Sequence, residues 1–269
     1  MTLRDKAILA EKAARAAGEM LLSHPHTPAK HKSENDFVTE MDLASERLIK
    51  SILLGACPED GFFGEEEGGS ETAPGRWIVD PIDGTSNFFK GNLLYTVSIA
   101  YELHGELVVG CVFCPPTGEM WLGVKGEGAT LNGEPIHVSD TSIPRESFLH
   151  MSFCHRVPWA NGYVMERLPA ITRQYSDMRR TGSAAYDLCS IASGRCEGFF
   201  ELCLHLYDVA AGVVILREAG GITTEWREDK DFRVTGHVLS SNQKIHEHLR
   251  SMLLNGNSSA ILDEWEFGI

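Results

Sequence analysis

The order of β-prone and helix-prone segments is the feature that most restricts how this chain can fold. Residues 77–124 are rich in β-branched and aromatic residues, and glycine-containing turns divide them into short runs. Such runs joined by tight turns are typical of an antiparallel meander. After Pro144 the pattern changes, because short apolar runs now alternate with longer helix-like segments. This alternation favours a layered sheet, parallel or mixed, that is covered by helices.

We therefore predict an α/β fold with an α+β N-terminal half, residues 1–143, and an α/β C-terminal half, residues 144–269. Thr2 with Asp5 marks the start of a first helix, and Gly55 is the expected stop of a second. In the first half we expect helices at 2–22 and 40–54, a polar loop at 30–36, strands at 61–64, 77–79, 96–103, 106–113 and 120–124, and a hairpin at 126–139. In the second half we expect strands at 148–153, 178–180, 199–202 and 238–239, and helices at 163–175, 184–192, 209–219 and 243–254.

The composition excludes several classes of protein. Hydrophobic residues make up 43% of the 269 residues, which is enough for a large core. The net charge of −14 disfavours a nucleic-acid backbone or an anionic membrane surface as a partner. No segment has the length of a membrane span, and the N-terminal stretch does not resemble a secretion signal. The seven cysteines are odd in number and scattered, so we expect reduced thiols and a cytoplasmic location.

An apolar strand, Trp77-Ile78-Val79, leads directly into the strongest chemical signal, Asp80-Pro81-Ile82-Asp83-Gly84-Thr85-Ser86-Asn87. Pro81 and Gly84 restrict the backbone so that Asp80 and Asp83 can aim at one point. Two such carboxylates repel each other unless a hard divalent cation lies between them, and Mg²⁺, Mn²⁺ or Ca²⁺ suits oxygen ligands. Thr85 and Ser86 then begin a short helix whose free N–H groups suit a phosphate. The alternative is an ordinary turn that caps a helix.

Four motifs in order along the chain resemble the inositol monophosphatase family. The segment Asp80 to Phe88 resembles the family's D-P-[IL]-D-G-[ST]-x-N-F signature. Gly64-Glu65-Glu66 resembles its G-E-E element, Asp36 to Asp42 its D-x-V-T-x-x-D element, and Tyr207 to Gly212 its W-D-x-A-A-G element. Any one of these motifs alone would be weak, but four in the same order are specific. The resemblance implies a five-layer αβαβα sandwich and a homodimer.

The resemblance also implies a set of metal ligands. Glu65 and the Ile82 carbonyl would bind the first Mg²⁺, Asp80 would bridge two ions, and Asp83 and Asp208 would bind the second. A third ion at Glu65 and replacement by Mn²⁺ are further implications. Without the resemblance, Glu65 reads as part of a solvated acidic loop, and Asp208 reads as the N-cap of a helix that begins at Val209.

Further residues are implied in catalysis. Asp42 and Thr85 would lie behind the attacking water, with Glu65 as a third catalytic group. Thr39 and Asp42 also fit a capping box, and both interpretations can hold together. Lys32 resembles a basic residue of the family's N-terminal loop, but its distance to Asp36 is one residue shorter than usual. A solvated lysine is the alternative.

The resemblance implies that the substrate contacts come from both halves. Gly84, Thr85 and Ser86 would hold the phosphate beside Asp208. Gly182, Ser183 and Ala184 resemble a turn that contacts substrate hydroxyls, and the alternative is a plain helix start. Glu201 matches a position that contacts the organic part of the substrate, and the alternative is a surface carboxylate at a strand edge.

The function implied is Mg²⁺-dependent hydrolysis of a small phosphate monoester by an activated water, without a phosphoenzyme. An inositol monophosphate is the first choice, and Asn87-Phe88 favours it, because nucleotide enzymes of this class usually carry an acidic residue at 87. Fructose-1,6-bisphosphate, histidinol phosphate and a nucleotide 3′-phosphate are the alternatives. Lithium sensitivity is also implied. Outside the enzyme class, a regulatory or binding protein could keep the fold without turnover.

Two cysteine-containing patterns point to packing instead of chemistry. Cys111-Val112-Phe113-Cys114 has the spacing of a zinc or redox site but lies inside an apolar run with no second pair. Cys203 and His205 lie close to Asp208, but soft ligands do not suit a hard-oxygen site. We therefore expect these cysteines to pack in the core.

Overall fold

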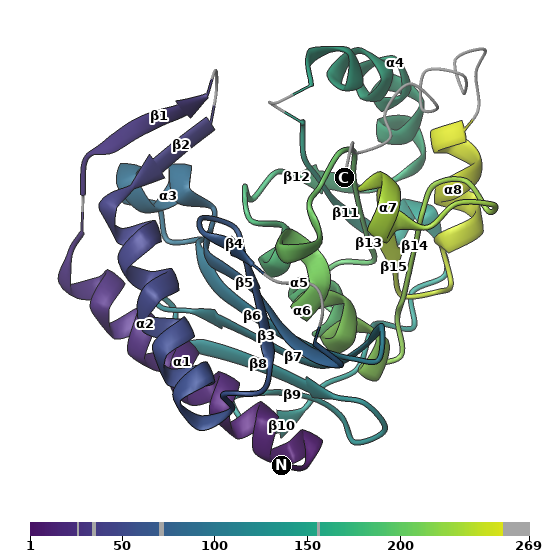
Figure 1. Cartoon of the computed structure of the whole chain (residues 1–269). Helices are drawn as coiled ribbons and strands as arrows, with labels where there is room; N and C mark the ends of the chain where they lie inside the picture. Colours follow the sequence, from purple (N-terminus) through teal and green to yellow (C-terminus); the bar gives the residue numbers. More distant parts are fainter. Residues whose placement is uncertain (26, 34–35, 70–72, 155–156, 255–269) are drawn as a thin grey trace.

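Helices and sheets alternate in five layers in the computed structural model (Figure 1). It describes residues 1–25, 27–33, 36–69, 73–154 and 157–254, without the side chains of residues 29–38, 158 and 159. The layered α/β architecture expected from the sequence is confirmed. The division into halves at residues 143 and 144 stays a prediction.

The first layer contains α1 (Leu3–Ser23) and α2 (Glu40–Ala56). Thr2 and Asp5 form the expected capping box, which satisfies N–H groups at the start of α1. The expectation that Gly55 ends the second helix was wrong, because α2 continues to Ala56 and the Cys57 N–H still bonds to the Leu53 carbonyl. Glycine costs helix stability but does not by itself end a helix whose apolar face is buried.

The second layer is an eight-stranded sheet in the order β10-β9-β8-β7-β6-β5-β3-β4. The meander is confirmed, since β5, β6, β7, β8, β9 and β10 pair antiparallel in sequence order. In contrast, β3 runs parallel to β5. The strands are β3 (Gly61–Gly64), β4 (Gly68–Gly69), β5 (Gly75–Asp83), β6 (Thr96–Leu103), β7 (Glu106–Cys114), β8 (Glu119–Val124), β9 (Gly128–Leu131) and β10 (Glu134–Pro135).

The polar loop expected at 30–36 was wrong. Most of it belongs to two short antiparallel strands, β1 (Ala29–Ser33) and β2 (Asp36–Thr39), which form a separate two-stranded sheet. This ladder consists of backbone hydrogen bonds, which a polar sequence can form as well as an apolar one. Hydrophobic periodicity therefore gave no sign of it.

The fourth layer is a five-stranded mixed sheet in the order β12-β11-β13-β15-β14. The first three strands pair parallel, whereas β15 pairs antiparallel with both β13 and β14. The sequence did not indicate β14, α7 or the 3₁₀ turn η1, all of which are short. The strands are β11 (Phe148–Met151), β12 (Asp177–Arg179), β13 (Gly198–Glu201), β14 (Ile222–Thr224) and β15 (Val238–Ser241), and the remaining elements are η1 (Pro144–Glu146), α3 (Thr85–Lys90), α4 (Pro158–Gln174), α5 (Ala184–Ala192), α6 (Leu206–Glu218), α7 (Phe232–Thr235) and α8 (His246–Leu254).

Three clusters of buried side chains hold the layers together. The first joins α1 and α2 to one face of the large sheet, the second lies around α5 and α6 between the two sheets, and the third lies under α4 and α8. Phe199 belongs to the second cluster and its neighbour Phe200 to the third, because successive side chains of a strand point to opposite faces. Both faces of the smaller sheet are therefore buried, as the five layers require.

All seven cysteines are buried, and none of them forms a disulfide within the described chain. Cys111 packs in the first cluster and Cys114 in the second, so the two thiols face opposite sides of the large sheet. The expectation that this pair packs in the core is confirmed.

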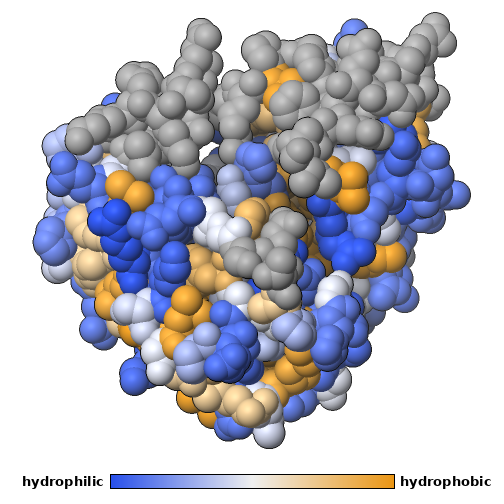
Figure 2. Space-filling model, in the orientation of Figure 1, coloured by the Kyte–Doolittle hydropathy of each residue, from blue (hydrophilic) through white to orange (hydrophobic). Residues whose placement is uncertain are grey.

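The face of the molecule seen in Figure 2 is largely hydrophilic, with hydrophobic side chains scattered over it. Within the described residues, no helix combines the length and the apolar character needed to cross a membrane.

Candidate active site

Glu65 and Asp80 lie side by side because each follows the same point of two parallel strands. Gly64 of β3 stands opposite Val79 of β5, and the Glu65 N–H donates to the Val79 carbonyl at 3.2 Å. The carboxyl ends of parallel strands meet at one edge of a sheet, where ligands of α/β proteins commonly bind. Two acidic residues that are 15 positions apart thus become neighbours.

A β-bulge brings Asp83 to the same face as Asp80. Asp80 stands opposite Ser98 of β6, and Asp83 stands opposite Thr96, so three steps along β5 match two steps along β6. The extra residue restores the side-chain alternation that a spacing of three would otherwise break. The strand is longer than predicted, because β5 includes both aspartates. The placement of Asp80 and Asp83 on one face, expected from Pro81 and Gly84, therefore arises from a bulge near the end of this strand.

The carboxylate of Asp83 is held by the start of α5. Its Oδ2 accepts hydrogen bonds from the Ser183 hydroxyl at 2.6 Å and the Ala185 N–H at 2.8 Å, and its Oδ1 accepts one from the Ala184 N–H at 3.3 Å. Burial outweighs these bonds and raises the pKa of Asp83 to about 7. The segment Gly182 to Ala184 therefore positions an acidic side chain, and this contact was not anticipated.

Asp208 lies in the first turn of α6, where its Oδ2 accepts a hydrogen bond from the His205 N–H at 2.6 Å. The helix begins at Leu206, three residues earlier than expected. Asp208 is therefore not the N-cap of a helix that starts at Val209, and that alternative was wrong.

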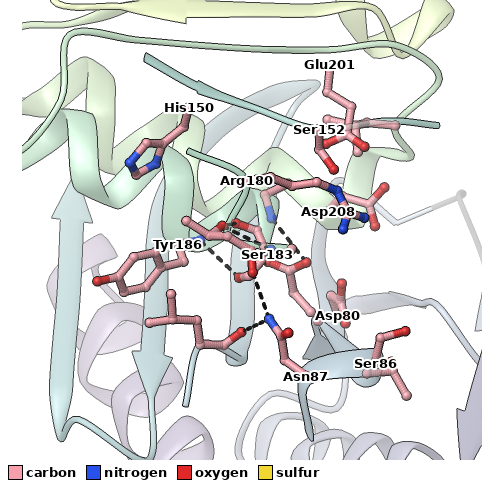
Figure 3. Close-up of a pocket in the computed structure, with 18 of the residues that line it drawn as sticks. Asp80, Ser86, Asn87, His150, Ser152, Arg180, Ser183, Tyr186, Glu201 and Asp208 are labelled. Atoms are coloured by element: carbon pink, nitrogen blue, oxygen red, sulfur yellow. Dashed lines mark hydrogen bonds between the residues drawn. The ribbon is translucent and has the colours of Figure 1, made fainter. Parts of the chain in front are cut away.

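These acidic residues line one cavity of about 820 Å³ between the two sheets, part of which is drawn in Figure 3. The predicted residues that line it are Glu65, Asp80, Ile82, Asp83, Gly84, Thr85, Ser86, Gly182, Ser183, Ala184, Glu201 and Asp208. Every predicted metal or substrate residue thus lies on one cavity, although their roles stay predictions.

The cavity brings several buried carboxylates together, and Arg179, Arg180 and Arg195 line it as well. Burial, and then the charges of Glu65, Asp83 and Asp208, raise the pKa of Asp80 well above its usual value. An oxygen-only set of carboxylates fits Mg²⁺ or Mn²⁺, which would remove this repulsion. Among the side chains that the structure describes, no three His, Cys, Asp or Glu residues already form a closed ligand set. The carboxylates share a cavity without converging on one point.

Asp42 is not among the residues that line the cavity, but it bonds to Thr85, which is. Its Oδ1 accepts a hydrogen bond from the Thr85 hydroxyl at 3.1 Å, while its Oδ2 accepts bonds from the Thr39 N–H at 2.7 Å and hydroxyl at 2.6 Å. The capping box predicted at Thr39 is confirmed. The same side chain therefore contacts both the predicted cap and the predicted catalytic threonine.

Gly84 allows the turn from β5 into α3. It has φ +93°, and an added Cβ would lie 3.0 Å from the Gly182 carbonyl oxygen. Only glycine adopts such a backbone conformation without strain. The turn brings the start of α3 against the Gly182 segment, so residues about 100 positions apart meet at the cavity.

Glu201 ends β13 and is only 9% exposed. Burial, and then the charges of Asp208 and Asp187, raise the pKa of Glu201 well above its usual value. The alternative of a surface carboxylate at a strand edge was wrong. Lys32 lies on β1, but its side chain is outside the described part of the chain, so its predicted role is not tested.

Several residues that line the cavity were not predicted as site residues. They are Asn87, His150, Ser152, Arg180, Thr181 and Tyr186. Asn87 was considered only for substrate preference, yet its amide donates to the carbonyls of Leu94 at 2.5 Å and Thr181 at 2.9 Å. His150, inside a predicted strand, offered a weak signal. For Ser152, Arg180, Thr181 and Tyr186 the sequence offered no signal, because only the folded chain shows that their segments border the cavity.

The sequence and the fold of this chain are similar to those of known proteins. Residues 3–256 match the model of the inositol monophosphatase family. The Nus factor SuhB of Vibrio cholerae is 36% identical over 263 residues, covering 94% of this chain and 97% of that protein. A crystal structure of SuhB from Bartonella henselae is 32% identical, with a TM-score of 0.88 over 93% of this chain and 98% of that one. An inositol monophosphatase from Anabaena is 32% identical, with a TM-score of 0.86 over 97% and 100%. The chain therefore belongs to the inositol monophosphatase family.

Proposed function

We propose that this protein is a Mg²⁺-dependent phosphatase that hydrolyses a small phosphate monoester, with an inositol monophosphate as the leading substrate. The observation that supports it most is the group of carboxylates that line one cavity, from β5, from α6 and from the residue that follows β3. Family membership supports a phosphatase type of fold. The substrate and the metal are parts of the proposal.

The proposed ligands of Mg²⁺ are Glu65, Asp80, the Ile82 carbonyl, Asp83 and Asp208, with two or three ions per site. When bound, Mg²⁺ lowers the pKa of a water molecule and neutralises negative charge on the phosphate and the leaving oxygen. The Thr85 hydroxyl, held by Asp42, orients the attacking water together with Glu65. The Thr85 hydroxyl has two acceptors at 3.1 Å, Asp42 Oδ1 and the Ile82 carbonyl oxygen, so its single proton is donated inward and its oxygen can accept a hydrogen bond from that water.

Backbone groups of Gly84, Thr85 and Ser86 would hold the phosphate oxygens. The Ser183 region and Glu201 would contact the organic part of the substrate. A cavity of about 820 Å³ is larger than a phosphate group needs, so it leaves room for a ring that carries hydroxyls. Inhibition by lithium and assembly into a homodimer belong to the same proposal.

Names of the relatives support a second candidate function. The Vibrio cholerae relative is named a Nus factor, which points to transcription-related partners. That name does not fit our expectation that no nucleic acid is involved. A binding role in a transcription assembly is therefore the second proposal. The net charge of −14 favours a basic protein partner over bare nucleic acid as the direct contact.

The test is Mg²⁺-dependent phosphate release from an inositol monophosphate, fructose-1,6-bisphosphate, histidinol phosphate and a nucleotide 3′-phosphate, ranked by kcat/KM. Asp83→Asn should lower kcat on the best substrate by about 100-fold or more, because a metal ligand and a buried charge are lost together. Asp140→Asn is the matched control, since Asp140 is exposed and lies outside the cavity. Near-normal turnover in Asp83→Asn would refute the ligand assignment, and no release from any substrate would favour the binding role.

A further inference from the structure

His150 occupies a part of the cavity to which the proposed chemistry assigns no role. It lies on β11, opposite Arg179 of β12 and Phe199 of β13, and its side chain is 12% exposed. Figure 3 shows His150 and Tyr186 on one side of the view, with Asp80 and Asp208 on the other. The imidazole therefore lines the cavity at a distance from the carboxylates that would bind metal.

A buried carboxylate fixes the orientation of the imidazole, and a half-buried threonine hydroxyl bonds to that carboxylate. Its Nδ1 lies 2.6 Å from Asp187 Oδ1, and the Thr181 hydroxyl donates to the same oxygen at 2.7 Å. Asp187 lies on α5 and is 1% exposed, so its carboxylate cannot move into solvent. A hydrogen bond that a histidine donates to a buried carboxylate commonly holds a functional imidazole in one orientation.

This arrangement decides what the ring offers to a ligand. Because Asp187 is an acceptor, Nδ1 of His150 carries the proton and donates it to Oδ1. In the neutral ring, Nε2 then presents a lone pair. Within the described chain, the one hydrogen bond of the His150 ring is at Nδ1. Nε2 can therefore accept a hydrogen bond from a molecule in the cavity.

We propose that His150 is a specificity-determining residue that accepts a hydrogen bond from a hydroxyl on the organic part of the substrate, with Asp187 and Thr181 as its positioning residues. The ligand class is a polyhydroxylated phosphate monoester, and the inference rests on the proposed phosphatase function. A hydroxyl fits this site better than a second phosphate does, because a lone pair attracts a donor and an anionic oxygen has none to offer.

The alternative is that His150 only satisfies the buried Asp187 and has no contact with substrate. The two interpretations differ in one measurable ratio. A contact with a substrate hydroxyl affects only substrates that carry hydroxyls, whereas loss of structural support affects all substrates alike.

The experiment compares kcat/KM for an inositol monophosphate and for cyclohexyl phosphate, which has the ring without hydroxyls, at saturating Mg²⁺. His150→Phe keeps a ring of similar size but cannot accept the bond. We expect its kcat/KM to fall about 10- to 100-fold on the inositol phosphate and to change less than about twofold on cyclohexyl phosphate. His137→Ala is the control, because His137 is exposed and lies outside the cavity. Equal losses on both substrates, or no loss on either, would overturn the proposal.

Asp187→Asn gives an independent test and also serves if His150→Phe fails to fold. It keeps an acceptor for Thr181 but no longer fixes the proton on Nδ1, so the same selective loss should appear in weaker form. The double variant should show no further loss beyond His150→Phe, because a positioning residue acts only through its partner. Additive losses would contradict that role.

Failure of the phosphatase proposal can be recognised separately. In that case the wild-type protein releases phosphate from neither substrate. Calorimetry with inositol monophosphate and Mg²⁺ then tests His150 directly, and an equal Kd for the wild type and His150→Phe, or no binding at all, would overturn the inference.

Discussion

At the scale of single residues, Asp42 contacts the cap of α2 and the predicted catalytic threonine with different oxygens. One oxygen caps α2 through Thr39, and the other accepts the Thr85 hydroxyl. Burial raises the pKa of Asp42 to about 6 despite these bonds. The residue is therefore held in place more firmly than a solvated cap would be, but its ionised form costs stability.

The pKa of Asp42 predicts a pH dependence of stability in chelated protein. The folded state keeps this proton up to about pH 6, whereas the unfolded state loses it near 3.8. The folded state thus binds more protons than the unfolded state between these two pH values. The free energy of unfolding therefore falls as pH rises, by up to roughly 3 kcal/mol. In Asp42→Asn the fall should be smaller by this amount, because Asp83, whose pKa is also raised, is present in both proteins. Urea denaturation from pH 4 to 8 measures it, and a difference between the proteins that stays constant with pH would contradict the prediction.

Asn87 shows why an acidic residue does not suit this position here. Its amide is a donor to two carbonyls that belong to distant segments, Leu94 and Thr181. An aspartate has no hydrogen to donate when ionised and would face both oxygens with a negative charge. Position 87 therefore joins α3 to the segment that leads into Gly182.

We predict that Asn87→Asp lowers the free energy of unfolding by about 2–4 kcal/mol, because two partly buried carbonyls lose their donor. Asn132→Asp is the matched control. There the side-chain oxygen accepts from the Met120 N–H at 2.9 Å, and an aspartate keeps that oxygen. Thermal or urea denaturation compares the two, and equal stability of both variants would be inconsistent with the role assigned to Asn87.

At the scale of elements, the position of Asp208 depends on how closely α6 approaches the large sheet. A Cβ added at Gly110 of β7 would lie 2.2 Å from the Ala211 carbonyl oxygen in α6. The same helix passes over Gly123 of β8, where an added Cβ would lie 2.8 Å from the Ile215 Cα. Glycines in adjacent strands thus let the backbone of α6 lie directly on the sheet.

Gly110→Ala should therefore destabilise the protein by about 1–3 kcal/mol and lower activity, since α6 must shift and carries Asp208 with it. Gly55→Ala is the contrasting variant. No heavy atom lies within 4 Å of a Cβ added there, and the site is an exposed turn of α2, so a gain of about 0.5–1 kcal/mol is expected. The free energies of unfolding of the two variants should differ in sign; a stable, active Gly110→Ala would disprove the close packing.

At the scale of the whole molecule, the carboxylates of the cavity come from elements that are far apart in sequence. Glu65 follows β3, Asp80 and Asp83 end β5, and Asp208 lies on α6. Without a cation these buried charges oppose the packing of α6 against the end of the sheet. A bound divalent ion would convert that repulsion into a link between layers.

Mg²⁺ should therefore stabilise chelated protein at pH 8, by about 2.7 kcal/mol when its concentration is 100 times its Kd. Asp80→Asn should be more stable than the wild type without metal, because an unfavourable buried charge is gone, and it should lose most of the response to Mg²⁺. Thermal denaturation at constant ionic strength measures both effects. A response to Mg²⁺ in Asp80→Asn as large as that of the wild type would exclude the cavity as its source.

The layers and most of the acidic residues of the site can be predicted from the amino-acid sequence alone. Apolar runs and alternation are local properties, so α1, the meander and α5 were predicted almost to their ends. The motifs at Glu65, Asp80 and Asp208 likewise lie in short segments whose residues can be read directly. Short elements such as β1, β2 and β14 were missed because backbone pairing, and not hydrophobic pattern, defines them.

How these residues meet depends on the folded chain. Register placed Glu65 beside Asp80, and the bulge in β5, which exists only relative to β6, brought Asp83 to their side. Asp187, which sequence analysis did not single out, became the partner of His150 through the packing of α5 on the smaller sheet. Contacts between distant segments depend on strand register and layer packing, which no local pattern contains; for that reason the sequence could supply the reactive groups but not the cavity that they share.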